Sequence, residues 1–190
     1  SYGVSDTSSD AQLAGRQFLN LDSAVISSYG TAQNQDRGGK NAVQVQGNEI
    51  KLTENSWKKL DLGGYKITAD TILEFDYQST KANEIGGIGF DNDDRTTKSE
   101  TFQLSGYHTW GIQAFRNYSI NSGWKSYKIK AGDFLQGDYQ YLTFVNDDDV
   151  AGKGESSFRN IRLYERNQQS KVALQNIVEA SVSFSVAAVN

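Results

Sequence analysis

Residues 71–79 read TILEFDYQS, and this stretch decides the fold class. Leu73, Phe75 and Tyr77 recur at every second position, opposite polar side chains such as that of Glu74. Side chains of a β-strand point alternately to its two faces, so this period predicts a strand with one face on a core. The rest of the chain can be interpreted outward from this strand.

Similar short runs lie on both sides of it, separated by clusters of Gly, Asn and Asp that are typical of turns. Many short strands with turn signals between them favour an antiparallel arrangement over alternating strands and helices. We therefore predict an all-β fold, an antiparallel β-sandwich of the jelly-roll type, which closes two sheets over one core. The predicted strands are residues 41–47, 49–53, 65–69, 71–79, 84–90, 101–106, 124–130, 139–145 and 156–165.

The length of 190 residues fits one such domain. Residues 1–17 are small and polar and are expected to form a linker or arm, and residues 18–165 the β-sandwich domain. Residues 166–190 lack the Asn, Asp and Gly turns and are expected to be a C-terminal extension, either a helix, a strand or the start of another module. Because the chain begins at Ser1 and contains no Met, we expect a mature form or an excised piece.

The composition excludes several classes of function. With no Cys, the chain forms no disulfide and no thiolate metal site. Asp and Glu number 23 against 19 Lys and Arg, an acidic balance that argues against nucleic acid as a partner. No apolar run approaches the length of a membrane span.

Two acidic loops carry the strongest chemical signal. One is GFDNDD at residues 89–94 and the other is FVNDDD at residues 144–149, each at the end of an apolar run. Close carboxylates repel one another, and Ca²⁺ binds about six to eight carboxylate, carbonyl and water oxygens. The loops therefore predict either a bound divalent cation or solvated turns capped by Asp and Asn. The candidate ligands are Asp91, Asp93, Asn146, Asp147, Asp148 and Asp149. A third polar stretch, QNQDRGG at residues 33–39, is interpreted as a loop.

A second candidate site is the loop SGYHTWG at residues 105–111, which holds two aromatic rings and the single His of the chain. An aromatic ring on a loop can stack on the apolar face of a sugar while polar groups bind its hydroxyls. The alternative is that Trp110 plugs one end of the sandwich. The candidate sugar-binding residues are Tyr107, His108, Trp110, Arg116 and Asn117.

The strand at residues 84–90, EIGGIGF, is rich in Gly. If Ile88 and Phe90 face the core, Gly87 and Gly89 face the other way. Such a surface is either a flat floor for a ligand or a place where another strand crosses closely or forms a bulge.

Catalysis is the weaker interpretation. A nucleophilic triad would depend on His108 alone, and no G-x-S-x-G motif is present. A glycosidase needs two carboxylates, for which Glu84 and an Asp remain candidates. Runs of carboxylates, however, suit a cation better than they raise the pKa of one acid selectively.

Several blocks together resemble a family. They include NEIGGIGFDND at residues 83–93, TFQLSGYHTWGI at 101–112, YLTFVNDDD at 141–149 and SSFRNIRLYE at 156–165. From about residue 23 to residue 165 the chain resembles a bacterial calcium-dependent carbohydrate-binding module. Modules of this kind are appended to secreted polysaccharide hydrolases and to repeats-in-toxin adhesins.

The resemblance implies a jelly-roll lectin domain, Ca²⁺ as cofactor, a monosaccharide or terminal sugar of a glycan as partner, and no catalysis. It also implies an extracellular or cell-surface location, as a monomeric module of a larger chain. Vicinal hydroxyls of the sugar would complete the coordination of Ca²⁺ at adjacent acidic loops. The alternatives are a small jelly-roll enzyme that degrades polysaccharides and an adhesin spacer that calcium only stiffens.

Overall fold

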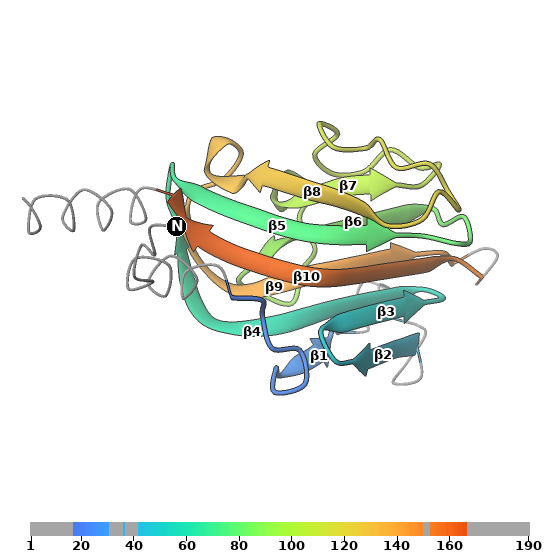
Figure 1. Ribbon diagram of the computed structural model, residues 1–190, viewed down its shortest axis with the longest axis horizontal. Helices are drawn as coiled ribbons and strands as arrows, with labels where there is room; N and C mark the ends of the chain where they lie inside the picture. Colours follow the sequence, from blue (N-terminus) through green and yellow to red (C-terminus); the bar gives the residue numbers. More distant parts are fainter. Residues whose placement is uncertain (1–16, 31–35, 37–41, 150–152, 167–190) are drawn as a thin grey trace, which may run out of the picture.

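The computed structural model describes residues 17–30, 36, 42–149 and 153–166, which form two layers of antiparallel β-sheet (Figure 1). The expectations for residues 1–16 and 167–190 lie outside the described residues. The strands are β1 (Ile26–Ser28), β2 (Val43–Gln46), β3 (Glu49–Thr53), β4 (Ser56–Ile67), β5 (Thr71–Gln78), β6 (Ile85–Asp91), β7 (Thr101–Ser105), β8 (Lys125–Lys130), β9 (Gly137–Asp147) and β10 (Glu155–Glu165). Two short 3₁₀ helices, η3 (Lys98–Glu100) and η4 (Ala131–Asp133), precede β7 and follow β8.

Each sheet has five strands. Sheet A has the order β1-β4-β9-β6-β7 and sheet B the order β2-β3-β10-β5-β8. All pairings between these strands are antiparallel, and Figure 1 shows β5, β8 and β10 in front of β6, β7 and β9. The predicted all-β, jelly-roll sandwich is confirmed. In the described part of the chain, no helix is both long and apolar enough to cross a membrane.

The core lies between the sheets and follows the predicted alternation. Leu73, Phe75 and Tyr77 of β5 are buried, and Ile88 and Phe90 of β6 meet them from the other sheet. Glu74 and Asp76, between the apolar residues of β5, are partly exposed on the outer face of sheet B. The alternation that predicted β5 thus separates core from surface.

Strand β4 is much longer than predicted. The sequence pattern predicted only residues 65–69, but the strand begins at Ser56. The pattern failed because two adjacent lysines hide the alternation: Lys59 lies beside Thr143 on the outer face of sheet A, and Lys58 pairs with Phe144 on the inner face. The short strand β1, which pairs with this part of β4, was also missed.

Lys58 is buried because it has an anionic partner. Its Nζ lies 2.7 Å from Oδ2 of Asp36 and donates to Oγ of Ser28 at 2.7 Å. The side chains of Lys58 and Asp36 are 2 % and 1 % exposed. Asp36, which the sequence placed in a loop, is therefore held against sheet A by a buried ion pair.

The glycines of β6 lie where strands cross closely. The β6–β7 register shifts between Gly86 and Gly87, and a Cβ on Gly87 would come within 2.7 Å of the carbonyl oxygen of Phe102. A Cβ on Gly89 would collide with the carbonyl oxygen of Glu100. Of the two interpretations of this strand, the bulge with a close backbone crossing is confirmed, and the outer face here is not an open floor.

We expect Asp36→Ala to lower the free energy of unfolding by about 3 to 5 kcal/mol, because it leaves the Lys58 ammonium buried without its counter-ion. Urea denaturation measures this. The double variant Asp36→Ala with Lys58→Met removes both charges and should recover most of the loss. If the single variant is as stable as the double variant, an unpaired Lys58 ammonium costs nothing at this position and the ion pair does not stabilise the fold.

Candidate functional site

The two acidic loops lie at opposite ends of sheet A. Strands β6 and β9 pair so that Ile85 faces Asp147 and Asp91 faces Tyr141. Asp91 lies six positions beyond Ile85 along an extended strand, a distance of about 20 Å. The expectation that the two acidic loops are adjacent is therefore wrong, because each loop follows one of two antiparallel neighbours.

The carboxylates of the first acidic loop accept hydrogen bonds from groups of the protein. Asp91 accepts hydrogen bonds from the Tyr29 hydroxyl at 2.6 Å and from the backbone N–H of Asn92 at 2.8 Å. Asp93 accepts from the backbone N–H of Arg95 at 2.8 Å. Burial raises the pKa of Asp91, against the effect of the hydrogen bond from Tyr29.

The last carboxylate of this loop, that of Asp94, bridges to the neighbouring edge of sheet A. It receives the ammonium of Lys59 at 2.8 Å and the backbone N–H of Gly30 at 2.9 Å, and the hydrogen bond from Lys59 lowers its pKa. These contacts are those of a capped turn, the alternative to a metal site here. The predicted ligation by Asp91 and Asp93 stays a prediction.

At the opposite end, three carboxylates converge. Glu84, Asp147 and Asp149 each place one oxygen within 4.8 Å of the others. Glu84 precedes β6 and its N–H donates to the carbonyl oxygen of Asp147, the last residue of β9, at 2.8 Å. The N–H of Asp149 donates to Oε2 of Glu84 at 3.2 Å. Backbone pairing thus fixes the three side chains at one strand end, and the group could hold a metal ion.

The electrostatics of this carboxylate trio are unfavourable without a cation. Burial, together with the charges of Asp149 and Glu84, raises the pKa of Asp147 to about 6. The indole N–H of Trp57 and the charge of His108 act the other way. Trp57 is 2 % exposed, and its Nε1 has no hydrogen-bond partner of normal geometry in the described part of the chain. The carboxylate oxygens of the trio lie close together and repel one another, and oxygen ligands of this kind suit a divalent cation such as Ca²⁺.

The loop at residues 106–111 is attached to the same strand end. The backbone N–H of His108 donates to the carbonyl oxygen of Glu84 at 3.0 Å. Gly106, at φ 111°, allows this approach, because a Cβ there would collide with that carbonyl. The Tyr107 hydroxyl lies 3.3 Å from Oε1 of Glu84, and Nδ1 of His108 lies 4.0 Å from it.

The rings of this loop differ in exposure. Tyr107 is 58 % exposed and His108 is also exposed, while Trp110 is partly buried. The Trp110 ring meets the Trp57 ring edge-on, with centroids 5.2 Å apart. Trp110 therefore packs on a small apolar cluster that includes Trp57, Ile85 and Val145 of sheet A, and it stays partly exposed.

Arg116 and Asn117 are engaged within the protein. Arg116 donates to the carbonyl oxygen of Gly106 at 2.6 Å and to Oγ1 of Thr109 at 2.8 Å. The Asn117 amide oxygen accepts from the hydroxyl of Tyr127 on β8 at 2.9 Å. Both side chains therefore brace loops, and their predicted contact with a sugar stays a prediction.

Asn146, predicted as a metal ligand, has a structural role in the described chain, and its ligation stays a prediction. Its side chain is fully buried between the sheets, where its oxygen accepts from Asn83 and Ser156 at 3.0 and 2.8 Å. Its amide nitrogen donates to the carbonyl oxygens of Glu54 and Gly154. All its hydrogen-bonding positions are used. It lies one residue before Asp147, and a period of two turns it inward when Asp147 turns outward.

The second acidic loop is also partly structural. Oδ2 of Asp148 accepts the backbone N–H groups of Lys153 and Gly154, at 2.8 and 2.6 Å. Asp148 thus links the residues that follow β9 to those that precede β10. Glu84, which the sequence suggested only as a catalytic acid, takes the place of Asn146 beside Asp147 and Asp149. That Glu84 lies beside Asp147 could have been predicted only from the register between β6 and β9.

Comparison with known proteins gives structural likenesses only. No protein-family model matches the chain, and no curated protein matches it. A family 30 carbohydrate-binding module from the cellulosomal cellulase Cel9D-Cel44B of Clostridium thermocellum is 18 % identical, with 75 % of this chain and 91 % of that one covered and a TM-score of 0.43.

Two further structures show the range. A family 61 module in complex with β-1,4-galactotriose is 10 % identical, with coverages of 74 % and 99 % and a TM-score of 0.39. The glycoside hydrolase domain of Endo-D from Streptococcus pneumoniae R6 is 11 % identical, with coverages of 75 % and 21 % and a TM-score of 0.41. Likenesses of this size establish neither a family nor a ligand.

The raised pKa of Asp147 makes a prediction about stability in the absence of divalent cations. The folded state holds this proton up to about pH 6, whereas the carboxyl ordinarily loses it near 3.8. Stability should therefore fall as pH rises from about 4 to about 6. Asp147→Asn keeps the neutral form at every pH. In EDTA we expect it to raise the melting temperature by about 3 °C at pH 7.5 and to have little effect at pH 4.

The matched control is Asp138→Asn, which changes an exposed carboxyl at the opposite end of β9. It should leave the melting temperature unchanged at both pH values. Equal effects of the two variants would show that the repulsion within the trio is absent.

Proposed function

We propose that this protein is a non-catalytic, calcium-dependent, lectin-like module that binds a sugar at the end of sheet A. The observation that carries the proposal is the convergence of Glu84, Asp147 and Asp149 beside the exposed ring of Tyr107. This site includes Asp147, Asp149, Tyr107 and His108 of the predicted metal and sugar residues, although the first acidic loop lies at the far end of sheet A.

The carboxylates supply the oxygen ligands. Ca²⁺ bound here would offset the repulsion within the trio and present open coordination positions to vicinal hydroxyls of a sugar. Glu84 is held by the N–H of Asp149 and by the Tyr107 hydroxyl. Binding should therefore tie the β9–β10 connection and the loop at residues 106–111 to one point.

The ring side chains supply the sugar contact. Tyr107 and the exposed part of Trp110 would stack on the C–H face of the sugar, and His108 would hydrogen-bond a hydroxyl. Arg116, through Gly106 and Thr109, orients the loop that carries these rings. Few sugar atoms would be buried, so we expect a Kd in roughly the micromolar-to-millimolar range.

The biological setting is part of the same proposal. Modest single-site affinity suits display in several copies, where linked sites raise the effective binding. We propose an extracellular role, in a surface adhesin or a secreted polysaccharide hydrolase, with the glycan of a polysaccharide or host glycoconjugate as partner.

We expect Ca²⁺ to raise the melting temperature of the chain, and Asp149→Asn to weaken calcium binding at least about tenfold, because it removes one anionic ligand. Isothermal titration calorimetry with CaCl₂ measures the affinity. Asp93→Asn, the matched change in the first acidic loop, should have little effect. The reverse ranking of the two variants would move the ion to the first loop.

We expect Tyr107→Ala to reduce calcium-dependent binding on a glycan array about tenfold or more, and EDTA to abolish binding at this site, because the ring and the ion hold the same sugar. Trp110→Phe should retain most binding, since it keeps an aromatic ring. Ile120→Ala, at an exposed apolar residue in a later loop, is the control.

The same experiment separates the alternatives. Release of reducing ends from an array polysaccharide would identify a hydrolase that uses the Glu84 and Asp147 carboxyls. A calcium-induced rise in melting temperature with no glycan signal would identify a structural spacer.

A further inference from the structure

The outer face of sheet B carries a hollow that the proposed calcium site does not use. Its volume is about 320 Å³, and it lies over β5, β8 and β10. The side chains that line it include those of Phe18, Glu74, Asp76, Ser126, Lys128 and Arg162. Figure 1 shows these three strands on the side turned toward the reader.

The carboxylate of Asp76 anchors the floor of this groove. It accepts hydrogen bonds from Oγ of Ser126 at 2.7 Å and from Nδ2 of Asn160 at 2.9 Å, and it pairs with Nε of Arg159 at 3.2 Å. The Asp76 carboxylate therefore joins the three strands β5, β8 and β10 at the floor of the groove. These contacts fix the floor in the absence of a ligand.

The cations beside Glu74 are held less tightly. Nζ of Lys128 and Nη1 of Arg162 both lie 3.8 Å from carboxylate oxygens of Glu74, beyond hydrogen-bond distance, while the Tyr164 hydroxyl donates to Glu74 at 2.9 Å. The Lys128 side chain is 64 % exposed. Its ammonium and the Arg162 guanidinium thus have N–H donors to offer to a ligand.

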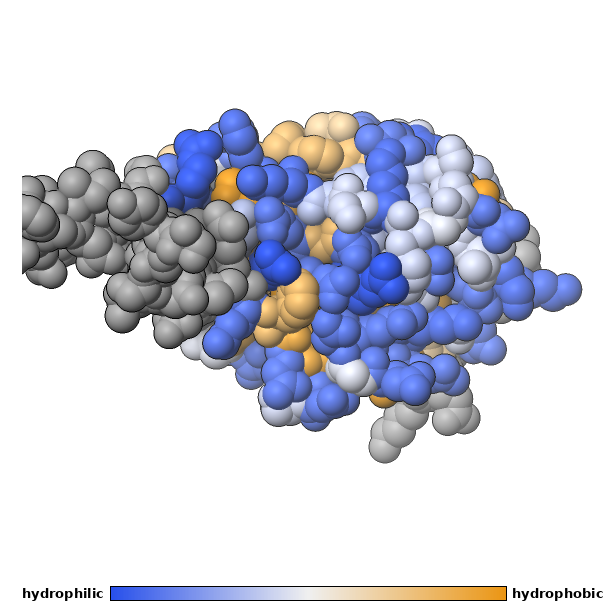
Figure 2. All heavy atoms as spheres, viewed as in Figure 1, coloured by the Kyte–Doolittle hydropathy of each residue, from blue (hydrophilic) through white to orange (hydrophobic). Residues whose placement is uncertain are grey.

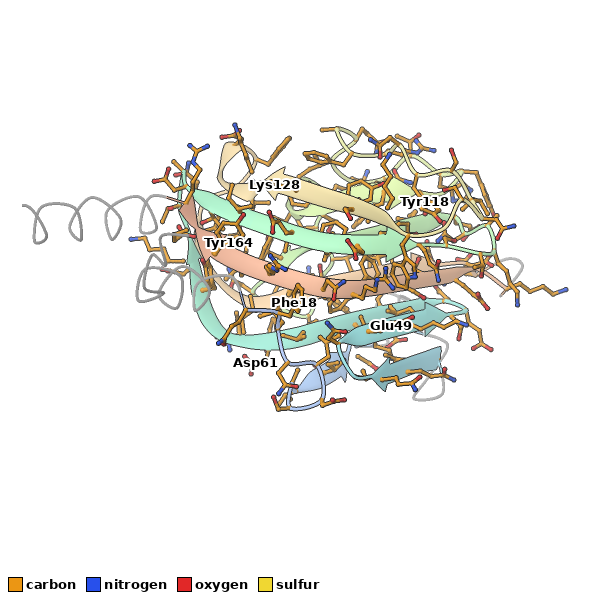
Figure 3. The ribbon with its side chains drawn as sticks, viewed as in Figure 1. Phe18, Glu49, Asp61, Tyr118, Lys128 and Tyr164 are labelled. Atoms are coloured by element: carbon orange, nitrogen blue, oxygen red, sulfur yellow. The ribbon has the colours of Figure 1, made fainter. Side chains whose placement is uncertain are left out.

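Aromatic rings border the same surface. Phe18 is 41 % exposed and its ring packs on the Arg162 guanidinium, 4.2 Å from ring centroid to Cζ. Trp124 packs in the same way on Arg159, at 4.0 Å. Figure 3 labels Phe18 and Lys128 on this face, and Figure 2 shows hydrophobic surface among hydrophilic side chains at the position of Phe18. The guanidinium groups hold the two rings in place beside the groove.

We infer that this groove is a second binding site, for a neutral oligosaccharide, and that it works without calcium. Sugar hydroxyls both donate and accept hydrogen bonds, which matches a groove with carboxylates and cations side by side. Rings at its border offer apolar surface to the sugar C–H groups. An anionic ligand would face Glu74 and Asp76, and a cationic one would face Lys128 and Arg162, so a neutral polyol is the ligand that meets no like charge.

The test is calorimetric titration of the full chain in EDTA with three neutral hexasaccharides, cellohexaose, xylohexaose and mannohexaose, and with an oligogalacturonate as the anionic arm. We expect at least one neutral hexasaccharide to bind with a Kd below about 5 mM. Phe18→Ala should weaken that binding about tenfold, and Lys128→Ala about threefold to tenfold. Both residues are exposed, so neither variant should unfold the protein.

The control is Tyr107→Ala, which should leave binding in EDTA unchanged because Tyr107 belongs to the calcium site. No neutral binding in EDTA, binding of the oligogalacturonate alone, or full binding by both groove variants would each overturn the inference. The calcium site is tested separately by binding that appears only with CaCl₂ and is lost in Tyr107→Ala, so either site can fail without the other.

Discussion

The antiparallel pairing of β6 with β9 is the constraint on which the functional geometry depends. It runs without interruption from Ile85–Asp147 to Asp91–Tyr141 at the centre of sheet A. Both acidic loops follow these strands, so the pairing sends them to opposite ends of the molecule. The same pairing brings Glu84, which precedes β6, beside the residues that follow β9. The backbone hydrogen bonds between β6 and β9 thus separate the two acidic loops, and they bring Glu84 beside the second loop.

A buried amide network fixes the end of this ladder. Asn83 donates to Asn146 and Ser156, and accepts from Ser105, which also contacts the Tyr77 hydroxyl at 2.7 Å. Buried polar groups are tolerated when they are fully partnered, and such networks then hold one arrangement. Asn83 and Asn146 are the chain neighbours of Glu84 and Asp147. Their fixed positions leave the two carboxylates little freedom to move apart, which is why the repulsion between them persists.

The charged side chains are arranged differently on the two sheets. At the end of sheet A, three carboxylates meet without a Lys or Arg at salt-bridge distance in the described part of the chain, and burial with like charge raises the pKa of Asp147. On the outer face of sheet B, carboxylates alternate across strands with Lys and Arg, and burial is outweighed at Asp76, whose pKa is lowered by hydrogen bonds and Arg159. The first arrangement is suited to a cation, and the second to a ligand with no net charge.

The sequence by itself determined the fold class and the strand that anchors it, because a period of two in residues 71–79 has one physical solution, a half-buried strand. It also placed the ring-bearing loop at residues 105–111, since Gly residues bracket it. It could not determine that β4 begins at Ser56, because the burial of Lys58 depends on Asp36, which lies 22 residues away. Nor could it show that Asn146 points inward, that Glu84 joins Asp147 and Asp149, or that Phe18 borders a groove on sheet B. Those facts depend on register and on which strands become neighbours, and only the tertiary structure decides them.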